Sequence, residues 1–165
     1  ALIIDVRGNG GGSDDHAKEV MGRFVDRQTL VSFVRYKSGP GRNELGDFLT
    51  RSIEPKGSSS FLNKPVFILT NRRCYSANEF FIVSMKSLPH VLLVGDTTGG
   101  GSANAIPREL GNGWYYTMPR WLQYDLDKKT FEGKGIYPHH PVWTSKSDST
   151  AGRDLILEKA MELAP

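Results

Sequence analysis

Three short apolar runs, each followed directly by polar residues or glycine, constrain the fold of this chain more than any other feature. They cover residues 2–6, 65–70 and 90–95, with the sequences LIIDV, PVFILT and HVLLVG. Apolar runs of this length without polar alternation are typical of strands buried on both faces of a parallel sheet. Helical patterns follow the first and second runs. The sequence therefore predicts an α/β domain, with a layered and largely parallel sheet and flanking helices.

The predicted helices follow from apolar spacing and from residues that start or stop helices. The first starts at residues 13–15, and its apolar residues repeat at helical spacing: Val20, Met21, Phe24 and Val25. The second covers residues 77–88 and is stopped by Pro89. A last helix is expected at about 150–163, capped by Ser149 or Thr150.

The segments between these elements are less regular. Residues 29–36 are predicted to form a strand, because they are rich in β-branched and aromatic residues. Residues 38–64 contain Gly, Pro, Ser and charge, and predict a surface excursion with one short helix. Residues 105–126 predict a meander in which Asn112-Gly113 is a hairpin turn.

Length and composition exclude several classes of protein. The 165 residues suit one domain, and the net charge of +3 comes from scattered basic residues, which does not favour nucleic-acid binding. No apolar run reaches the length of a membrane span. A single cysteine, Cys74, excludes an internal disulfide and a cysteine-based zinc cluster. Because the chain starts without methionine and enters a buried strand at once, we expect residues 1–165 to be one domain of a longer protein with upstream segments.

Ser76 lies where the predicted strand at 65–70 turns into the predicted helix at 77–88, in the sequence CYSANEFF. Ser76-x-x-Glu79 is a capping-box pattern, in which the hydroxyl accepts an N–H of the helix start and the glutamate reaches back. The same position suits a nucleophile, because the helix dipole favours negative charge at its N-terminus. The two interpretations are compatible, and the pattern alone favours the cap.

Glycine-rich loops follow two of the predicted strands, at residues 7–13 and 96–104. Neither suits a nucleotide: the second has no phosphate-binding lysine and no following helix, and the first runs into Asp14-Asp15, which would repel a pyrophosphate. Backbone N–H groups of such a loop can instead stabilise an oxyanion, together with the N–H of Ala77 after the serine. A plain tight turn is the alternative for Gly10–Gly12, and these residues taken alone favour it.

Three motifs in this order resemble those of the tail-specific, or carboxyl-terminal processing, serine peptidases of family S41. They are DVRGNGGG at residues 5–12, SANE at residues 76–79 and VGDTTGG at residues 94–100. The resemblance implies a fold related to ClpP and crotonase, built from ββα units. It also implies a hydrolase that cleaves peptide bonds in proteins or peptides without a metal or cofactor. Family members are mostly exported in bacteria. The compartment of this chain stays open, as does its oligomeric state, for which a homo-oligomer is one alternative.

The resemblance also assigns residue roles. Ser76 matches the nucleophile, and the N–H groups of Gly11 or Gly12 and of Ala77 match the oxyanion hole. In the bacterial processing proteases a lysine of the third motif is the general base, but the matching residue here is Gly101. The sequence is thus more similar to the tricorn-core and retinoid-binding-protein-like branch, in which an upstream histidine is the base and a glutamate supports the site. Glu132, in FEGKGIYP, matches that glutamate.

Alternative nucleophiles and bases within the chain are weaker candidates. Cys74 ends a strand with no histidine near it in sequence, so a packed thiol is expected. His16 and His90 are predicted to be solvated. The adjacent His139 and His140 could approach the loop of Glu132, but they lack the further ligands that a metal site needs. We therefore expect residues 1–165 alone to be inactive, or nearly so, as a peptidase.

Two other functions fit the same predicted fold. One is a non-catalytic module that binds peptides or apolar ligands, as in the retinoid-binding branch. The other is a crotonase-like enzyme acting on acyl-thioesters, which uses the same oxyanion geometry. Ser76 within SANE argues against both. Substrate specificity stays open at this stage.

Overall fold

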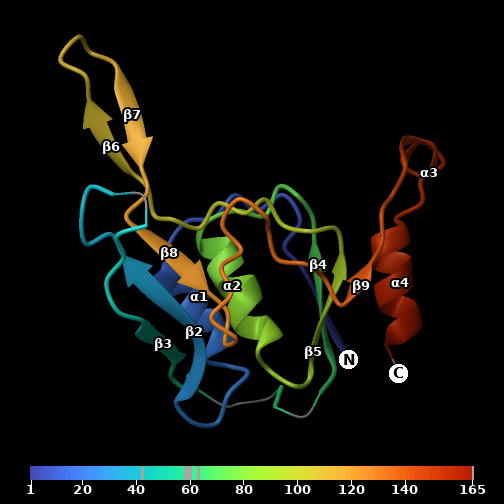
Figure 1. The fold of residues 1–165 in the computed structure, drawn as a ribbon. Coiled ribbons are helices and arrows are strands. Elements are labelled where there is room, and N and C mark those ends of the chain that lie inside the picture. Colours follow the sequence, from blue (N-terminus) through green and yellow to red (C-terminus); the bar gives the residue numbers. More distant parts are fainter. Residues whose placement is uncertain (42, 58–60, 63, 165) are drawn as a thin grey trace.

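The computed structural model describes residues 1–165 except for residues 42, 58–60, 63 and 165. Its central sheet is parallel and has the order β1-β4-β5-β9 (Figure 1). These strands are β1 (Leu2–Asp5), β4 (Val66–Thr70), β5 (Val91–Gly95) and β9 (His140–Pro141). The predicted α/β class, with a parallel sheet and flanking helices, is confirmed.

A second, antiparallel sheet has the order β3-β2-β8. A separate two-stranded hairpin, β6-β7, extends from the body of the molecule (Figure 1). The strands are β2 (Thr29–Tyr36), β3 (Leu49–Ile53), β6 (Ile106–Glu109), β7 (Tyr115–Met118) and β8 (Trp121–Tyr124). The helices are α1 (Asp14–Met21), α2 (Ala77–Lys86), α3 (Lys146–Thr150) and α4 (Leu155–Leu163). Among the described residues, no helix is both long and apolar enough to cross a membrane.

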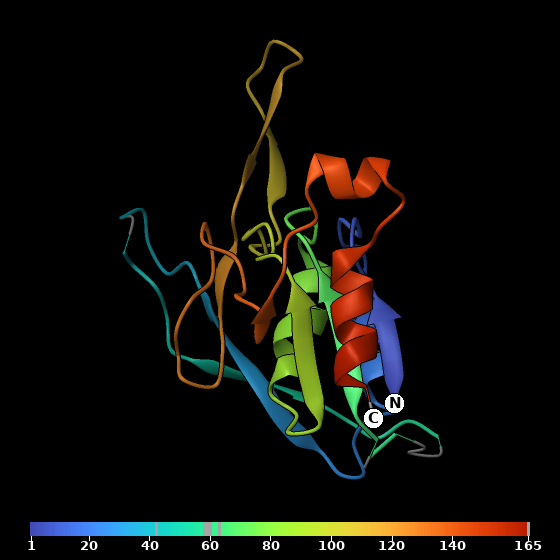
Figure 2. The same cartoon turned by 90° about the vertical axis from the view of Figure 1, so that its right-hand side faces the viewer.

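Helices α1 and α2 lie between the two sheets, and α4 covers the other face of the central sheet (Figures 1 and 2). Side-chain alternation along β4 supplies both faces: Val66 and Ile68 pack in the cluster with α2, whereas Phe67 and Leu69 pack in the cluster with α4. All five residues of β4 are buried. Helix α2 is buried from Ala77 to Met85, as expected for a helix that is apolar on most of its surface.

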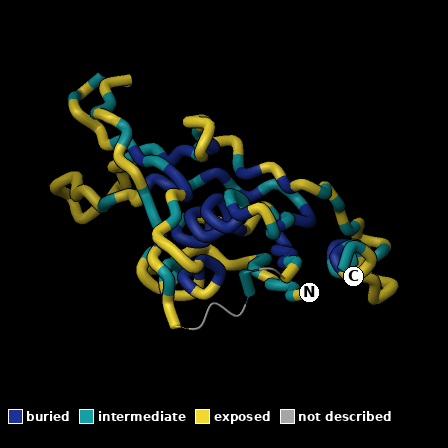
Figure 3. Tube along the Cα trace, turned by 90° about the horizontal axis from the view of Figure 1, so that it is seen from below, coloured by how far each residue is buried: buried dark blue, intermediate teal, exposed yellow. Residues whose placement is uncertain are grey.

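Buried residues concentrate in α2 and the strands beside it, whereas the β6-β7 hairpin and α3 are mostly exposed (Figure 3). The parallel order β1-β4-β5 places the loops that follow these strands side by side. The loop with Ser76 follows the middle strand, and the two glycine loops follow its neighbours on either side. Carboxyl ends of parallel strands are where α/β proteins usually bind ligands.

Several predicted elements differ from the structure. The predicted surface excursion at 38–64 contains strand β3, which pairs with β2, and no helix among its described residues. The predicted meander is a hairpin at the expected Asn112-Gly113 turn, but β8 pairs with β2 and not with β7. The first difference is a pairing between consecutive strands across a long loop, and the second is a pairing between strands that are distant in sequence.

The predicted helix ends are also partly wrong. Helix α1 ends at Met21, because the chain turns at Gly22, whose carbonyl accepts from the N–H of Lys56, three residues after β3. Phe24 and Val25, which were predicted on the helix, lie beyond its end but are buried as expected. The last helix is split into α3 and α4, with Asp154 as the cap of α4 and Thr150 at the end of α3. Gly152, at φ +72°, makes the break between them.

Candidate active site

Ser76 immediately precedes helix α2 and has a strained backbone. Its φ of 58° and ψ of −129° lie in a region of backbone conformation that residues other than glycine rarely adopt. Such a conformation costs about 1–3 kcal/mol. Its side chain makes no capping hydrogen bond. The capping-box interpretation of Ser76-x-x-Glu79 is therefore wrong for this structure, and the hydroxyl is left available for other contacts.

Both neighbouring loops hold the turn at Ser76. The N–H of Ser76 donates to the carbonyl of Gly101 at 2.9 Å, and the N–H of Tyr75 donates to the carbonyl of Asn9 at 3.3 Å. Gly11 approaches so closely that a Cβ on it would lie 2.6 Å from the Cβ of Ser76. Because Gly11 also has a φ of +109°, only glycine fits there without strain.

The predicted oxyanion donors differ in their hydrogen bonds. The N–H of Gly11 donates to Oδ1 of Asn9 at 2.9 Å and is already engaged. For the N–H groups of Gly12 and Ala77, no acceptor is found among the residues that the structure describes. Helix N-termini stabilise negative charge through such unpaired donors. Gly12 and Ala77 are thus the pair that could bind an oxyanion beside Ser76.

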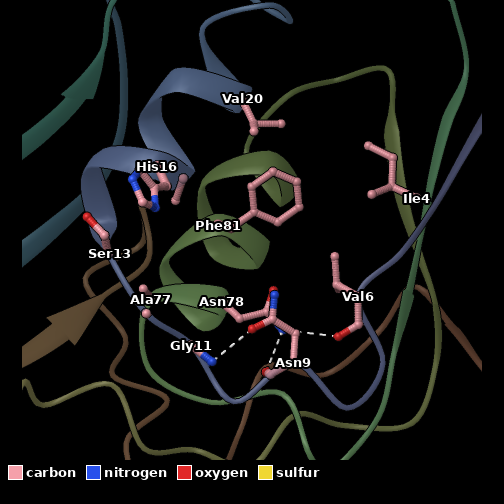
Figure 4. A pocket seen from close by; sticks show the side chains of 12 residues that line it. Ile4, Val6, Asn9, Gly11, Ser13, His16, Val20, Ala77, Asn78 and Phe81 are labelled. Carbon is pink, nitrogen blue, oxygen red and sulfur yellow. Dashed lines mark hydrogen bonds between the residues drawn. The ribbon is translucent and has the colours of Figure 1, made fainter.

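Asn78, which sequence analysis did not single out, joins the serine turn to the first glycine loop. Its buried side chain donates through Nδ2 to the carbonyl oxygens of Val6 at 3.2 Å and Asn9 at 3.0 Å (Figure 4). A buried amide that bonds two carbonyls fixes their spacing. The only signal in the sequence was its place within SANE.

Glu79 performs the same function for the second glycine loop. Its carboxylate is fully buried and accepts from Oγ1 of Thr98 at 2.5 Å, from the N–H of Gly100 at 2.8 Å and from the N–H of Gly101 at 2.7 Å. Burial raises the pKa of Glu79, and the three donors act against that increase. Glu79 thereby places the Gly101 carbonyl that accepts from Ser76.

Glu132 contacts the loop beside Ser76 rather than Ser76 itself. Its Oε2 accepts from both the N–H and the hydroxyl of Ser102, each at 3.0 Å. The adjacent N–H of Gly133 donates to the carbonyl of Gly100 at 2.7 Å. Glu132 is far from Ser76 in sequence, but the fold brings it to Ser102. The residue before Ser102 is Gly101, whose carbonyl accepts from the N–H of Ser76.

Two arginines anchor the ends of the first glycine loop. Arg7, the first residue of the loop, pairs with Asp5 and with Asp154 at the start of α4, both at 2.7 Å. Hydrogen bonds from Arg7 lower the pKa of both carboxyls. Arg51, from β3, pairs at 2.6 Å with Asp14, the first residue of α1 after the loop. The loop that carries Gly11 and Gly12 is therefore held at both ends.

No base is bonded to the hydroxyl of Ser76 in the described part of the chain. Nδ1 of His139 accepts from the N–H of Leu93 at 2.9 Å, and this leaves that nitrogen no lone pair for a serine proton. Cys74 is a buried thiol that donates to the carbonyl of Val6 at 3.3 Å, and burial raises its pKa. No group of three metal-binding side chains occurs among the described residues.

A pocket of about 380 Å³ opens beside the two unpaired N–H groups. Its lining is largely apolar and includes Ile4, Val6, Val20 and Phe81 (Figure 4). Gly12 and Ala77 line it as well. His16 and Ser13 line it from the start of α1 (Figure 4). His16 is exposed, and together with Asn9, Ser13 and Asn78 it adds polar groups to the lining.

Comparisons with known proteins identify the family of this chain. The model of peptidase family S41 matches residues 1–142. The carboxy-terminal processing protease CtpA of Bacillus subtilis is 27% identical over 138 residues, which cover 82% of this chain and 27% of that protein. The tricorn protease of Thermoplasma acidophilum is 26% identical over 166 residues, covering 98% of this chain and 14% of that protein.

A crystal structure of a protein from Parabacteroides merdae, assigned as a peptidase, has the same fold. It superimposes with a TM-score of 0.91 at 38% identity, and the match covers 98% of this chain and 51% of that one. The chain thus spans about half the length of this relative and about a quarter of CtpA. On the family match and these likenesses, the chain belongs to peptidase family S41.

Proposed function

We propose that residues 1–165 form the catalytic domain of a serine endopeptidase that cleaves peptide bonds through an acyl-enzyme on Ser76. The observation that carries this proposal is a strained serine with an uncapped hydroxyl, next to N–H groups of Gly12 and Ala77 that have no acceptor among the described residues. Strained backbone at a helix N-terminus is a recurring way to present a nucleophile. The substrate is a protein or peptide.

The reaction follows from this geometry. Oγ of Ser76 adds to the scissile carbonyl and loses its proton to a base. The carbonyl oxygen becomes negative and is stabilised by the N–H groups of Gly12 and Ala77. The leaving amine takes the proton from the base, and water then hydrolyses the ester on Ser76. Glu132 supports the site by fixing Ser102, and hence the Gly101 carbonyl, from the other side.

The general base, we further propose, is a histidine outside residues 1–165. The support is the glycine at position 101 and the absence of a base bonded to Ser76 among the described residues. General-base help is worth roughly 10²–10⁴-fold, so residues 1–165 alone should hydrolyse a peptide anilide very slowly. Added imidazole should raise the rate in proportion to its concentration. The same imidazole response in Ser76→Ala, or rapid hydrolysis without imidazole, would contradict this assignment.

The apolar pocket beside Gly12 and Ala77 is proposed to receive the side chain of the residue that supplies the scissile carbonyl. Val20 lines the pocket from the last turn of α1 and is 49% exposed, so its replacement should not unfold the protein. Val20→Lys should lower kcat/KM for peptides with Leu or Phe at that residue by about tenfold, because a charge enters an apolar wall.

The matched control for this prediction is Met161→Lys. Met161 is 61% exposed on α4 and does not line the pocket. The Met161→Lys variant should therefore have the same kcat/KM as the unchanged protein. If both variants had the same kinetics as the unchanged protein, the pocket would not bind the substrate side chain.

A further inference from the structure

Tyr75, next to the proposed nucleophile, lies across the second glycine loop. A Cβ added to Gly99 would be 2.1 Å from Cζ of Tyr75, and one added to Gly101 would be 2.9 Å from its Cδ1. The ring therefore packs directly on this stretch of backbone and fills the space that side chains at 99 and 101 would need. Tyr75 is nevertheless 43% exposed, so part of its aromatic surface is open to solvent beside Ser76.

This packing explains the glycine at position 101. A lysine there would place its first side-chain carbon 2.9 and 3.3 Å from two ring atoms of Tyr75. Contacts as short as 2.9 Å between carbons are repulsive, so the ring or the loop would have to move. The aromatic ring can keep this position only when residue 101 has no side chain. The ring thus covers one side of the serine turn.

The sheet order shows which side this is. Strand β4, which precedes the serine turn, lies between β1 and β5. Gly12 follows β1, and the apolar pocket lies on that side as well. Gly99 and Gly101 follow β5, so Tyr75 extends toward the opposite side. When the scissile carbonyl oxygen points to Gly12 and the acyl side chain enters the pocket, the leaving amine extends away from both.

We propose that the exposed ring of Tyr75 forms a second binding surface, which takes the side chain of the substrate residue directly after the scissile bond. The surface is flat, aromatic and backed by glycines, so it selects an apolar residue at this position, and an aromatic one above all. This proposal rests on the proposed function, because it needs a peptide bound across Ser76.

The test compares two peptides that are identical up to the scissile bond and carry Phe or Gly directly after it. Aromatic pairs contribute enough to expect kcat/KM about two- to tenfold higher for the Phe peptide. Tyr75→Phe should keep this preference, because it keeps the ring. Tyr75→Leu still packs against the glycines but offers no aromatic face, and should reduce the ratio of the two kcat/KM values to near one.

The ratio separates binding from a structural role. If Tyr75 only held the glycine loop in place, Tyr75→Leu would lower both kcat/KM values equally and leave the ratio unchanged, which would overturn the proposal. A ratio near one in the unchanged protein would also overturn it. Failure of the proposed function has a different signature, which is cleavage of both peptides by Ser76→Ala.

Discussion

Ser76→Ala is expected to abolish peptide hydrolysis, with a loss of kcat of roughly 10⁶-fold, comparable to the removal of the nucleophile from other serine proteases. The fold should remain, because the Ser76 hydroxyl makes no capping hydrogen bond whose loss would destabilise α2. The free energy of unfolding should change by less than the ~1 kcal/mol typical of a lost helix cap. Steady-state hydrolysis and urea unfolding measure the two effects on the same samples.

Ser76→Gly sharpens this prediction. Glycine adopts a φ of 58° with ψ of −129° at little cost, so this variant should be as inactive as Ser76→Ala and more stable than the unchanged protein, by about 1–3 kcal/mol. Ser87→Ala, at the other end of α2, is the control and should retain activity. Hydrolysis that survives in both Ser76 variants would place the chemistry elsewhere.

Glu79→Ala should destabilise the protein by at least about 3 kcal/mol, because each buried donor left without an acceptor costs about 1–3 kcal/mol. Three donors lose their acceptor: the hydroxyl of Thr98 and the N–H groups of Gly100 and Gly101. The Gly101 carbonyl would then no longer be held against the N–H of Ser76, so activity should fall together with stability.

Glu79→Gln separates the contributions to this effect. Its carbonyl oxygen can still accept from Thr98 and Gly100, whereas its amide group faces the N–H of Gly101 as a second donor. Its stability in urea unfolding should therefore lie between those of Glu79→Ala and the unchanged protein. Glu162→Gln, at an exposed glutamate of α4, is the control. A Glu79→Ala variant within 1 kcal/mol of the unchanged protein would contradict the function assigned to this carboxylate.

Much of the fold could be predicted because its signals are local. The strands β1, β4 and β5 are apolar runs that end in turn residues, and each was predicted within one residue of its observed limits. Strands β3 and β9 were missed, since their own residues show little periodicity, and β9 also pairs with β5, which is distant in sequence. The division of the last helix depended on the backbone at Gly152, which a helical pattern does not reveal.

The candidate site was predicted in part for the same reason. Ser76 and the glycine loops have short, local motifs. The function of Glu79 could not be predicted from a local motif, because a serine followed three residues later by glutamate fits a capping box equally well. The decisive contact is between Ser76 and Gly101, 25 residues away, and only the fold shows it. The contact of Tyr75 with Gly99 and Gly101 was hidden from the sequence in the same way.

Covalent labelling tests the central claim, that Ser76 is an activated nucleophile, most directly. The full-length protein is treated with a fluorophosphonate, which reacts with activated serines, and the adduct is located by mass spectrometry of its peptides. We predict one adduct, on Ser76, and none in Ser76→Ala. A binding module or an acyl-thioester enzyme of the same fold would not be labelled there. An adduct on another residue, or peptide hydrolysis by a protein whose Ser76 stays unlabelled, would contradict the account.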